Sequence, residues 1–344
     1  MWLTFRDADL VKLGECNIIH AQGPLSIKIL SKLLVLKTRK VLTLHGWVLD
    51  ESKALVFVAR NLSEKANALL HYIMVVINWV IHRFIFIPFI YDYTTAVSDI
   101  TAKKNNVKAL VIPNPVICRD NLHGSSLNPA SKNGEIVFIT YVSIGGGKML
   151  SILRLIKIVY LLNQKLRSLG VKKYIVLLHI YGKDIPQSIV AKLSRIPYVR
   201  FMGYVEDYPE RLKSADLFIA GYAFPELGYA ALEAMCAGVP VVKFTEDPSQ
   251  EEIVDGFNGM LAFSDEEILE KLVKYVLNMD ELKRILAINA KNTILRRRSL
   301  KRIATIWKVV IENLKIKKRR SNKCCIYANI KSRTCYIQYH LLAE

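Results

Sequence analysis

The sequence predicts an α/β protein built on two doubly wound parallel sheets, and three observations support this prediction. Short apolar strands alternate with helical stretches over residues 16–115, and a second alternating series runs over residues 136–244. A stretch rich in Ser, Asn, Gly and Pro at residues 121–133 separates the two series, as expected for a linker. A chain of 344 residues is also long enough to form two domains.

The composition indicates a folded protein with an anionic partner. Apolar residues make up 52% of the chain and charged residues 23%, which excludes disorder and leaves a soluble or membrane-surface protein. The formal charge of +19 suits nucleic acid, anionic lipid or a phosphorylated substrate, and much of it lies at residues 296–298, 301–302 and 315–320. No zinc finger, RNA-recognition signature or basic–aromatic interleaving accompanies this charge, so nucleic acid is the weakest of the three partners.

The N-terminus and the cysteines favour a cytoplasmic location. Arg6, Asp7 and Asp9 interrupt any apolar run at the N-terminus, so no secretory signal peptide is expected. The six cysteines have no metal-ligand spacing, and we expect them to be reduced thiols.

The first series places polar side chains where its strands end. The stretches 16–21, 40–47, 93–99 and 109–115 each resemble a strand followed by polar residues, and His20, His45 and Asn114 fall at those ends. The carboxyl ends of the strands face the ligand crevice in a doubly wound sheet. Taken alone, a histidine such as His20 is more often structural.

Residues Leu69–Tyr91 form an apolar stretch that is long enough to span a bilayer. Polar residues, Arg83 and Pro88 interrupt it, and a central charge is costly in hydrocarbon. The sequence therefore favours a helix at about residues 64–84 whose exposed apolar side chains rest on a membrane surface. We expect this stretch and the basic residues 296–320 to share one face; the alternative is a core helix and a solvated basic end.

The second series begins with a glycine-rich loop between a strand, residues 136–142, and a helix, residues 150–169. Gly146 and Gly147 let the backbone approach a ligand closely, and Lys148 can meet a diphosphate. A flexible turn explains the same glycines equally well.

Residues 224–243 predict a loop, a buried helix over 229–237 that Gly238 ends, and a strand over 239–244. Glu226 precedes this helix and Glu233 lies within it. The two carboxylates can complement the helix dipole and pair with a base. Alternatively, the helix N-terminus binds a phosphate while the carboxylates accept hydrogen bonds from sugar hydroxyls.

The pattern Pro-Glu226-Leu-Gly228-Tyr229-Ala-Ala-Leu-Glu233 resembles the donor-site motif of family 4 glycosyltransferases, the glycogen-synthase-like retaining enzymes. In that family the first glutamate touches the donor sugar and the second holds the nucleotide ribose. Six residues separate Glu226 from Glu233 here, one fewer than in the family. The resemblance therefore assigns Glu233 to the ribose directly, and Glu226 to the sugar across a shortened loop.

The resemblance extends over about residues 15–316 and is strongest over 199–261. It makes His45 the histidine beside the transferred sugar and puts His20, Gln22 and Asn114 on the acceptor side, with Gln22 in place of a second histidine. It assigns further residues to the donor. These are Gly146, Gly147 and Lys148 at the diphosphate, Gly203 and Tyr204 at the base, and Gly228 and Tyr229 beside the donor. Tyr141 stands where the family has an arginine.

The resemblance implies a GT-B fold, with two facing Rossmann-like domains of which the N-terminal one is incomplete. The expected parts are an acceptor domain (residues 1–120), a linker (121–133), a nucleotide-sugar domain (134–298), a helix that returns to the first domain (299–320) and a poorly ordered tail (321–344). The implied activity is retaining transfer of a sugar from a nucleotide-sugar donor to a sugar or lipid-linked acceptor, with no metal required. The alternative is a non-catalytic remnant that acts as a subunit or as a scaffold on the membrane surface.

Overall fold

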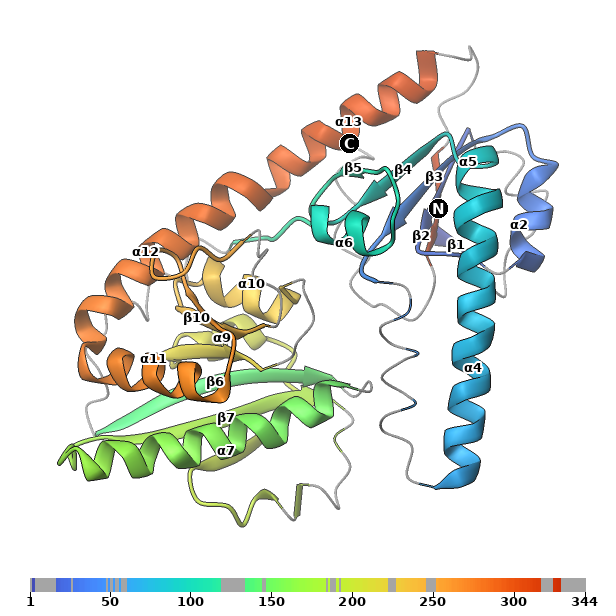
Figure 1. Cartoon of the computed structure of the whole chain (residues 1–344). Helices are drawn as coiled ribbons and strands as arrows, with labels where there is room; N and C mark the ends of the chain where they lie inside the picture. The colour runs from blue at the N-terminus through green and yellow to red at the C-terminus, as the bar shows by residue number, and fades with distance from the viewer. Residues whose placement is uncertain are drawn as a thin grey trace. The chain divides into compact units, whose positions relative to one another are not determined.

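The computed structural model of the chain consists of two compact units (Figure 1). One unit combines residues 1–115 with 300–344, and the other spans Val116–Ser299, compared with predicted boundaries at 120 and 298. The described residues are 2–3, 17–25, 27–47, 49, 52, 56, 61–118, 134–143, 147–183, 185, 190–191, 193–221, 227–245, 252–316 and 324–328.

The first unit is built on a six-stranded parallel sheet. Its strands, in spatial order, are β1 (Trp2–Leu3), β12 (Cys324–Ala328), β2 (Ile18–Gln22), β3 (Arg39–Leu44), β4 (Tyr93–Ala96) and β5 (Leu110–Val111). Strand β12 lies inside the segment predicted to be a tail, so that prediction is wrong for these five residues. Its sequence Cys-Cys-Ile-Tyr-Ala is the apolar, β-rich type of run that forms buried parallel strands.

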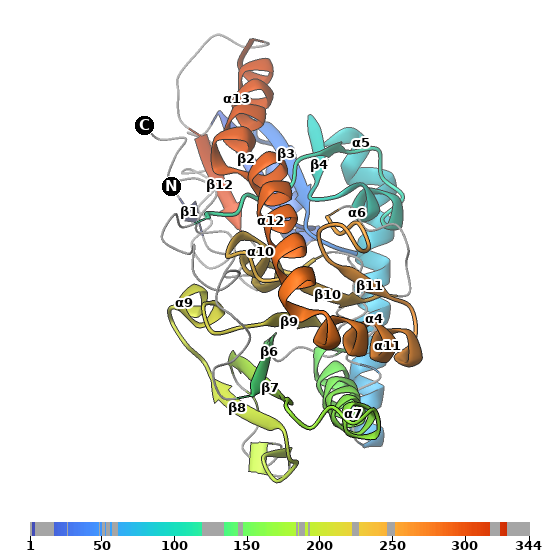
Figure 2. The same ribbon diagram turned by 90° about the vertical axis from the view of Figure 1, so that its left-hand side faces the viewer.

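Helices cover both faces of this sheet (Figure 2). Successive strand residues point to opposite faces, so Ile19 packs with α2 (Ile27–Leu34) and with the helix that begins at Leu62, whereas Ile18 packs with α13 (Leu300–Ile316). The basic helix and the apolar stretch therefore lie on opposite faces of one sheet. The prediction that they share a face is wrong.

The apolar stretch is one continuous helix, which extends beyond the predicted end at residue 84. It comprises α4 (Leu62–Ile81), a π-helical turn η1 (His82–Phe86) and α5 (Ile87–Phe89). Pro88 has no N–H to give the carbonyl four residues earlier, and the turn before it widens so that Ile87 N–H bonds to His82 O. By length and composition alone this helix is sufficient to cross a membrane.

The second unit holds another six-stranded parallel sheet. Its strands, in spatial order, are β11 (Met260–Ala262), β10 (Val241–Phe244), β9 (Leu217–Ala220), β6 (Glu135–Ser143), β7 (Ile175–Lys183) and β8 (Val199–Gly203). Its helices are α7 (Gly147–Ser168), α9 (Tyr208–Leu212), α10 (Tyr229–Cys236), α11 (Asp265–Leu277) and α12 (Met279–Arg298).

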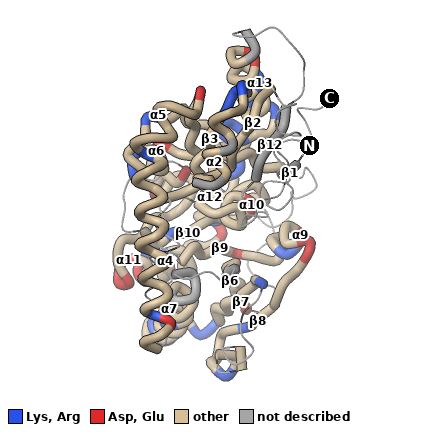
Figure 3. Tube along the Cα trace, turned by 90° about the vertical axis from the view of Figure 1, so that its right-hand side faces the viewer, with Lys and Arg blue, Asp and Glu red and all other residues tan. Residues whose placement is uncertain are grey.

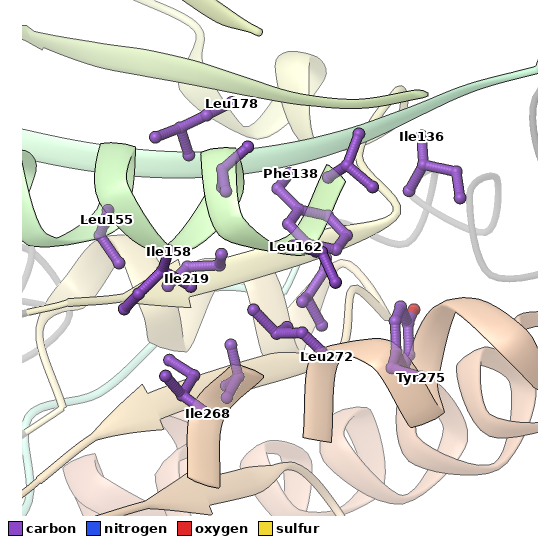
Figure 4. Close-up of a cluster of buried hydrophobic side chains, with 14 of the residues drawn as sticks. Ile136, Phe138, Leu155, Ile158, Leu162, Leu178, Ile219, Ile268, Leu272 and Tyr275 are labelled. Carbon is purple, nitrogen blue, oxygen red and sulfur yellow. The ribbon is translucent and has the colours of Figure 1, made fainter. Parts of the chain in front are cut away.

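Two apolar clusters hold the faces of the second sheet. Phe138, from the middle of β6, packs with Leu162 of α7 and Tyr275 of α11 on one face (Figure 4). On the other face Ile139 packs with residues of α10, including Ala231. Both faces of the sheet are therefore covered, as a doubly wound parallel sheet requires.

The two chain crossings between the units are fastened to each other within the second unit. Val116 N–H bonds to Arg298 O at 2.9 Å, and Val116 forms a parallel bridge with Ser299. The Arg298 guanidinium is buried and pairs with the buried Glu252 carboxylate. Arg298 was predicted to belong to the basic cluster, but it is a structural anchor at the end of α12.

The cysteines differ from the prediction at one pair. Cys118 and Cys236 form a disulfide, with Cα atoms 5.3 Å apart. These residues are 118 positions apart in the sequence, and only the packing of the segment after Val116 on α10 brings them together. The expectation of six reduced thiols is therefore wrong for this pair, and it no longer supports a cytoplasmic location.

Candidate active site

The donor motif forms the predicted loop, helix and strand at the carboxyl edge of the second sheet. The segment leaves β9, enters α10 with Gly228 as the N-cap and returns to the sheet as β10. Gly238 ends the helix with φ of 74°, a left-handed conformation that favours glycine, as predicted. Because β9 and β10 are parallel, the positive N-terminal end of α10 lies at the carboxyl edge, where an anion is favoured.

Glu233 lies half-buried on α10, near enough for its charge to act on Tyr141 of β6. Burial raises the pKa of Tyr141 on β6, and the nearby Tyr204 and Glu233 charges raise it further. Tyr141 is therefore a neutral phenol at neutral pH, able to donate one hydrogen bond. Glu233 and Tyr204 thus each lie within electrostatic range of Tyr141, the residue at the position where the family pattern has an arginine.

Tyr204 follows a left-handed turn at Gly203, where φ is 71°. Its ring is 53% exposed, and the Lys183 ammonium lies 5.7 Å from the ring centroid. An exposed ring beside a cation is suited to stacking on a planar base and attracting a phosphate. The sequence pointed to Gly203 and Tyr204, but it did not single out Lys183.

Tyr141 is held by a cluster of aromatic rings. Its ring packs edge-on against that of Tyr208 of α9, with ring centroids 5.0 Å apart. The ring of Tyr181 of β7 also packs edge-on against Tyr208, with centroids 5.8 Å apart. Tyr208 was missed because its role depends on α9 folding against the ends of β6 and β7. No local pattern in the sequence indicates that contact.

Asp216 and Asn258, two polar residues of the second unit, have structural roles. The Asp216 carboxylate accepts from Val137 N–H at 2.8 Å and pairs with Lys283 at 2.7 Å, joining β9 to β6 and α12. Asn258 accepts from Val254 N–H at 2.7 Å and donates to Glu252 O at 2.8 Å, closing the turn before β11. Both interactions hold backbone segments in place.

At the carboxyl edge of the first sheet, a row of polar side chains crosses three strands. His45, directly after β3, bonds through Nε2 to Gln22 Oε1 at the end of β2. Gln22 Nε2 lies 3.1 and 3.3 Å from the two ring nitrogens of His20. His20 Nε2 lies 2.6 Å from Thr43 Oγ1, which lies 2.6 Å from Thr95 Oγ1 on β4.

The chemistry of these groups fixes the direction of each bond. Thr95 donates to Leu42 O at 3.3 Å, so Thr43 donates to Thr95 and His20 Nε2 donates to Thr43. His20 Nδ1 then accepts from the amide of Gln22, because an amide nitrogen can only donate. The amide oxygen of Gln22 can only accept, so His45 carries its proton on Nε2 and a lone pair on Nδ1.

Burial keeps this row neutral. It lowers the pKa of His20 to about 3, with the charge of His45 adding to the effect, and it lowers the pKa of His45 to about 4. The indole of Trp307 on α13 covers His20, with ring centroids 4.6 Å apart. Thr43, Thr95 and Trp307 were not predicted as site residues, although two threonines in otherwise apolar strands were a visible signal.

The remaining predicted residues are placed only in part. Asn114 follows β5 at the same edge as His45. Gly147 and Lys148 open α7, beyond the carboxyl end of β6, and the side chain of Lys148 is not described. Glu226 and Gly146 lie outside the described residues. Within the part of the chain that the structure describes, no three His, Cys, Asp or Glu side chains are grouped to hold a metal ion.

Sequence comparison relates the second unit to glycosyltransferases. Residues 149–279 match the family described as "Glycosyl transferases group 1". The chain is 32% identical over 106 residues to the uncharacterized glycosyltransferase MJ1069 of Methanocaldococcus jannaschii, covering 30% of this chain and 27% of that protein. It is 28% identical over 130 residues to the putative glycosyltransferase EpsD of Bacillus subtilis, covering 37% and 34%. The matches thus span about a third or less of each relative.

Solved structures resemble the chain over most of its length. TarM superposes with a TM-score of 0.60 at 17% identity, over 87% of this chain and 54% of TarM. HepE of Anabaena, solved with UDP and glucose, superposes with a TM-score of 0.59 at 17% identity, over 89% of this chain and 80% of HepE. Sucrose-phosphate synthase of Thermosynechococcus elongatus superposes with a TM-score of 0.62 at 16% identity, over 88% of this chain and 74% of the synthase. The chain therefore has the GT-B glycosyltransferase fold, and its second unit contains the matched glycosyl transferase segment.

Proposed function

We propose that this protein is a family 4 glycosyltransferase that transfers a sugar from a nucleotide-sugar donor with retention of anomeric configuration. The observation that carries the proposal is the position of Glu233. Its carboxylate lies on the helix that follows β9, within the matched segment, and its charge acts on Tyr141, as does that of Tyr204. A carboxylate there can accept both ribose hydroxyls while Tyr204 stacks on the base.

The diphosphate of the donor would lie between the N-terminal ends of α7 and α10. Both helices begin at the carboxyl edge of the second sheet, and Lys148 belongs to the first turn of α7. Helix dipoles and a lysine stabilise the charge that develops on a leaving diphosphate, so this arrangement needs no metal ion. Tyr141 can add one hydrogen bond, where an arginine would add a full charge.

On the acceptor side, His45 would meet the transferred sugar. The hydrogen-bond row leaves Nδ1 as the acceptor atom, and none of the described residues donates to it. A sugar hydroxyl can supply that missing proton. HepE and a TarM mutant were each solved in complex with UDP, so UDP and UDP-sugars are the first donors to test.

The donor site can be tested by calorimetry with UDP and UDP-glucose. Glu233→Gln should weaken binding by about 1–3 kcal/mol, or about 5- to 150-fold, because a hydrogen bond to a charged group is lost. Glu270→Gln on the exposed face of α11 is the matched control and should bind as the wild type does. Unchanged affinity in a folded Glu233→Gln protein would remove Glu233 from the site.

A non-catalytic remnant that still binds a nucleotide is the second candidate, and the tyrosine at position 141 favours it. The two functions differ in turnover. A transferase releases UDP when acceptor sugars are added and yields a product with the donor's anomeric configuration. A remnant binds UDP with the same dependence on Glu233 but releases none.

A further inference from the structure

We propose that the helix Leu62–Phe89 docks the first unit on an anionic lipid bilayer, lying in the membrane surface with its outer face in the acyl chains. This inference goes beyond sugar transfer and does not depend on it. It rests on the distribution of polar and apolar residues around the helix.

The helix is amphipathic in the reverse sense, with its apolar side turned outward. Its outward side carries a stripe of large apolar residues, each 45–85% exposed. We call this set the apolar stripe: Leu62, Leu69, Leu70, Ile73, Met74, Ile77, Val80 and Phe84. At 100° per residue, these positions fall within about two fifths of the helix circumference. A water-facing surface of this kind is costly, because each large apolar side chain left in water forgoes about 1.5–3 kcal/mol of burial.

The opposite side packs against the first unit at the C-terminal end of the helix, where it carries a buried polar group. His82 is fully buried, where its Nε2 accepts from Leu25 N–H at 3.2 Å and its Nδ1 donates to Asn78 O at 3.2 Å. Trp79 and Phe86 are buried beside it against the first sheet. The inward residues are thus packed and hydrogen-bonded within the first unit, and the apolar stripe is the part of the helix that an external partner can cover.

The pattern of charge identifies that partner as lipid. Residues 66–82 contain no Asp, Glu, Lys or Arg, so along most of its length the helix has no charged rim of the kind that borders protein interfaces (Figure 3). Basic residues gather at its C-terminal end. Arg83 donates to Asn106 O, which brings the turn between α6 (Asp99–Lys104) and β5, with Lys104 and Lys108, to this end, and both lysines are exposed. Each such charge contributes about 1 kcal/mol at an anionic surface.

The packing favours a helix in the membrane plane over a helix that spans it. From Trp79 onward the inner side of the helix is packed on a sheet that holds a row of buried polar side chains, so this part cannot cross the hydrocarbon core. The rest, Leu62–Asn78, is 17 residues or about 26 Å long, and it includes Glu64, Lys65 and His71. That length is at the lower limit for a spanning segment, and these polar residues are unfavourable in one. In the plane, the apolar stripe enters the acyl region while the polar side stays with the protein.

The test is flotation of the full chain with phosphatidylcholine vesicles, with and without phosphatidylglycerol, at low and high salt. The wild type should float with the anionic vesicles at low salt and less at high salt. Ile73→Glu/Ile77→Glu, in the apolar stripe, should reduce the bound fraction about tenfold or more. Asn67→Glu/His71→Glu adds the same charges at exposed polar positions beside the apolar stripe rather than in it, and should bind at least half as well as the wild type.

A second pair of variants tests the orientation. Lys104→Glu/Lys108→Glu should lower binding to anionic vesicles about tenfold. Lys301→Glu/Arg302→Glu, on α13 across the sheet, should change it less than twofold. In the wild type, hydrogen exchange on vesicle addition should slow in residues 66–81 and not in α13, a readout that needs no variant.

Three results would overturn the proposal. In the first, the wild type fails to bind anionic vesicles at low salt. In the second, the two helix variants lose binding equally. In the third, the wild type is a dimer that Ile73→Glu/Ile77→Glu makes monomeric while vesicles protect nothing. A second copy of the chain would then cover the apolar stripe. Circular dichroism of every variant establishes that the comparison is between folded proteins.

Discussion

Gln22 supplies the hydrogen bonds that a second histidine would make in the family pattern. Its oxygen accepts from His45 and its nitrogen donates to His20, so one amide sets the tautomer of both rings. A histidine offers one donor and one acceptor in its neutral form, which is the same pair of functions. An amide at this position therefore offers the same two hydrogen-bonding functions as a neutral histidine.

Replacing Gln22 tests this equivalence. Gln22→Leu removes the amide that bonds to His20 and His45, and it should lower the free energy of unfolding by about 1–3 kcal/mol for each hydrogen bond lost. It should also lower kcat more than it raises KM, because His45 is no longer held in one tautomer. Gln22→His should restore most of both. Urea denaturation and steady-state kinetics measure the two effects, and a Gln22→Leu enzyme with wild-type kcat would contradict the positioning role.

Single residues of the site were predictable where local sequence places them at a strand end. His45 is such a residue, because it directly follows β3. Gln22, indicated by the family resemblance, is the last residue of β2, whereas His20 was expected at a strand end and lies in the middle of β2. Thr95 was missed because its contact with Thr43 depends on the register of β4 against β3, which residues 45–92 separate in sequence. Cys118 and Cys236 were missed for the same reason.

At the scale of elements, the strands and helices were predictable where periodicity or composition specifies them. The helix and strand after β9 formed as predicted, since helix formers, Gly238 and β-branched residues mark each boundary. Strand β12 was missed because five residues after a basic segment carry little periodic signal. Its place between β1 and β2 is set by pairing at long range.

Removing β12 tests its contribution. Truncation after Ile316 takes away the strand that pairs with all five residues of β2, leaving the edge of β2 and the core beneath it exposed. The shortened chain should melt at a lower temperature and scatter light through aggregation. Truncation after Ala328 retains β12 and is the control, so its melting temperature should be near that of the full chain. Equal melting temperatures for the two truncations would mean that β12 adds no stability.

At the scale of the whole molecule, the order of elements in the sequence predicted two parallel sheets, and the structure contains them. The extent of the first unit was less predictable, because it is assembled from both ends of the chain. The sequence also did not indicate which helix packs on which face of the first sheet. Ile18 and Ile19 are neighbours of the same type, and only the sheet decides that one meets α13 and the other the helix from Leu62.

This organisation predicts that the second unit folds alone. Residues Val116–Ser299 are continuous and include both apolar clusters of the second sheet, the Cys118–Cys236 pair and the Glu252–Arg298 ion pair. Expressed by itself, this fragment should unfold cooperatively in urea and bind UDP with an affinity within about tenfold of the full chain, because Tyr204 and Glu233 lie inside it. The first unit lacks this independence, since residues 1–115 alone would lack α13 and β12. A fragment 116–299 that folds but does not bind UDP, while the full chain does, would show that the first unit contributes to the donor site.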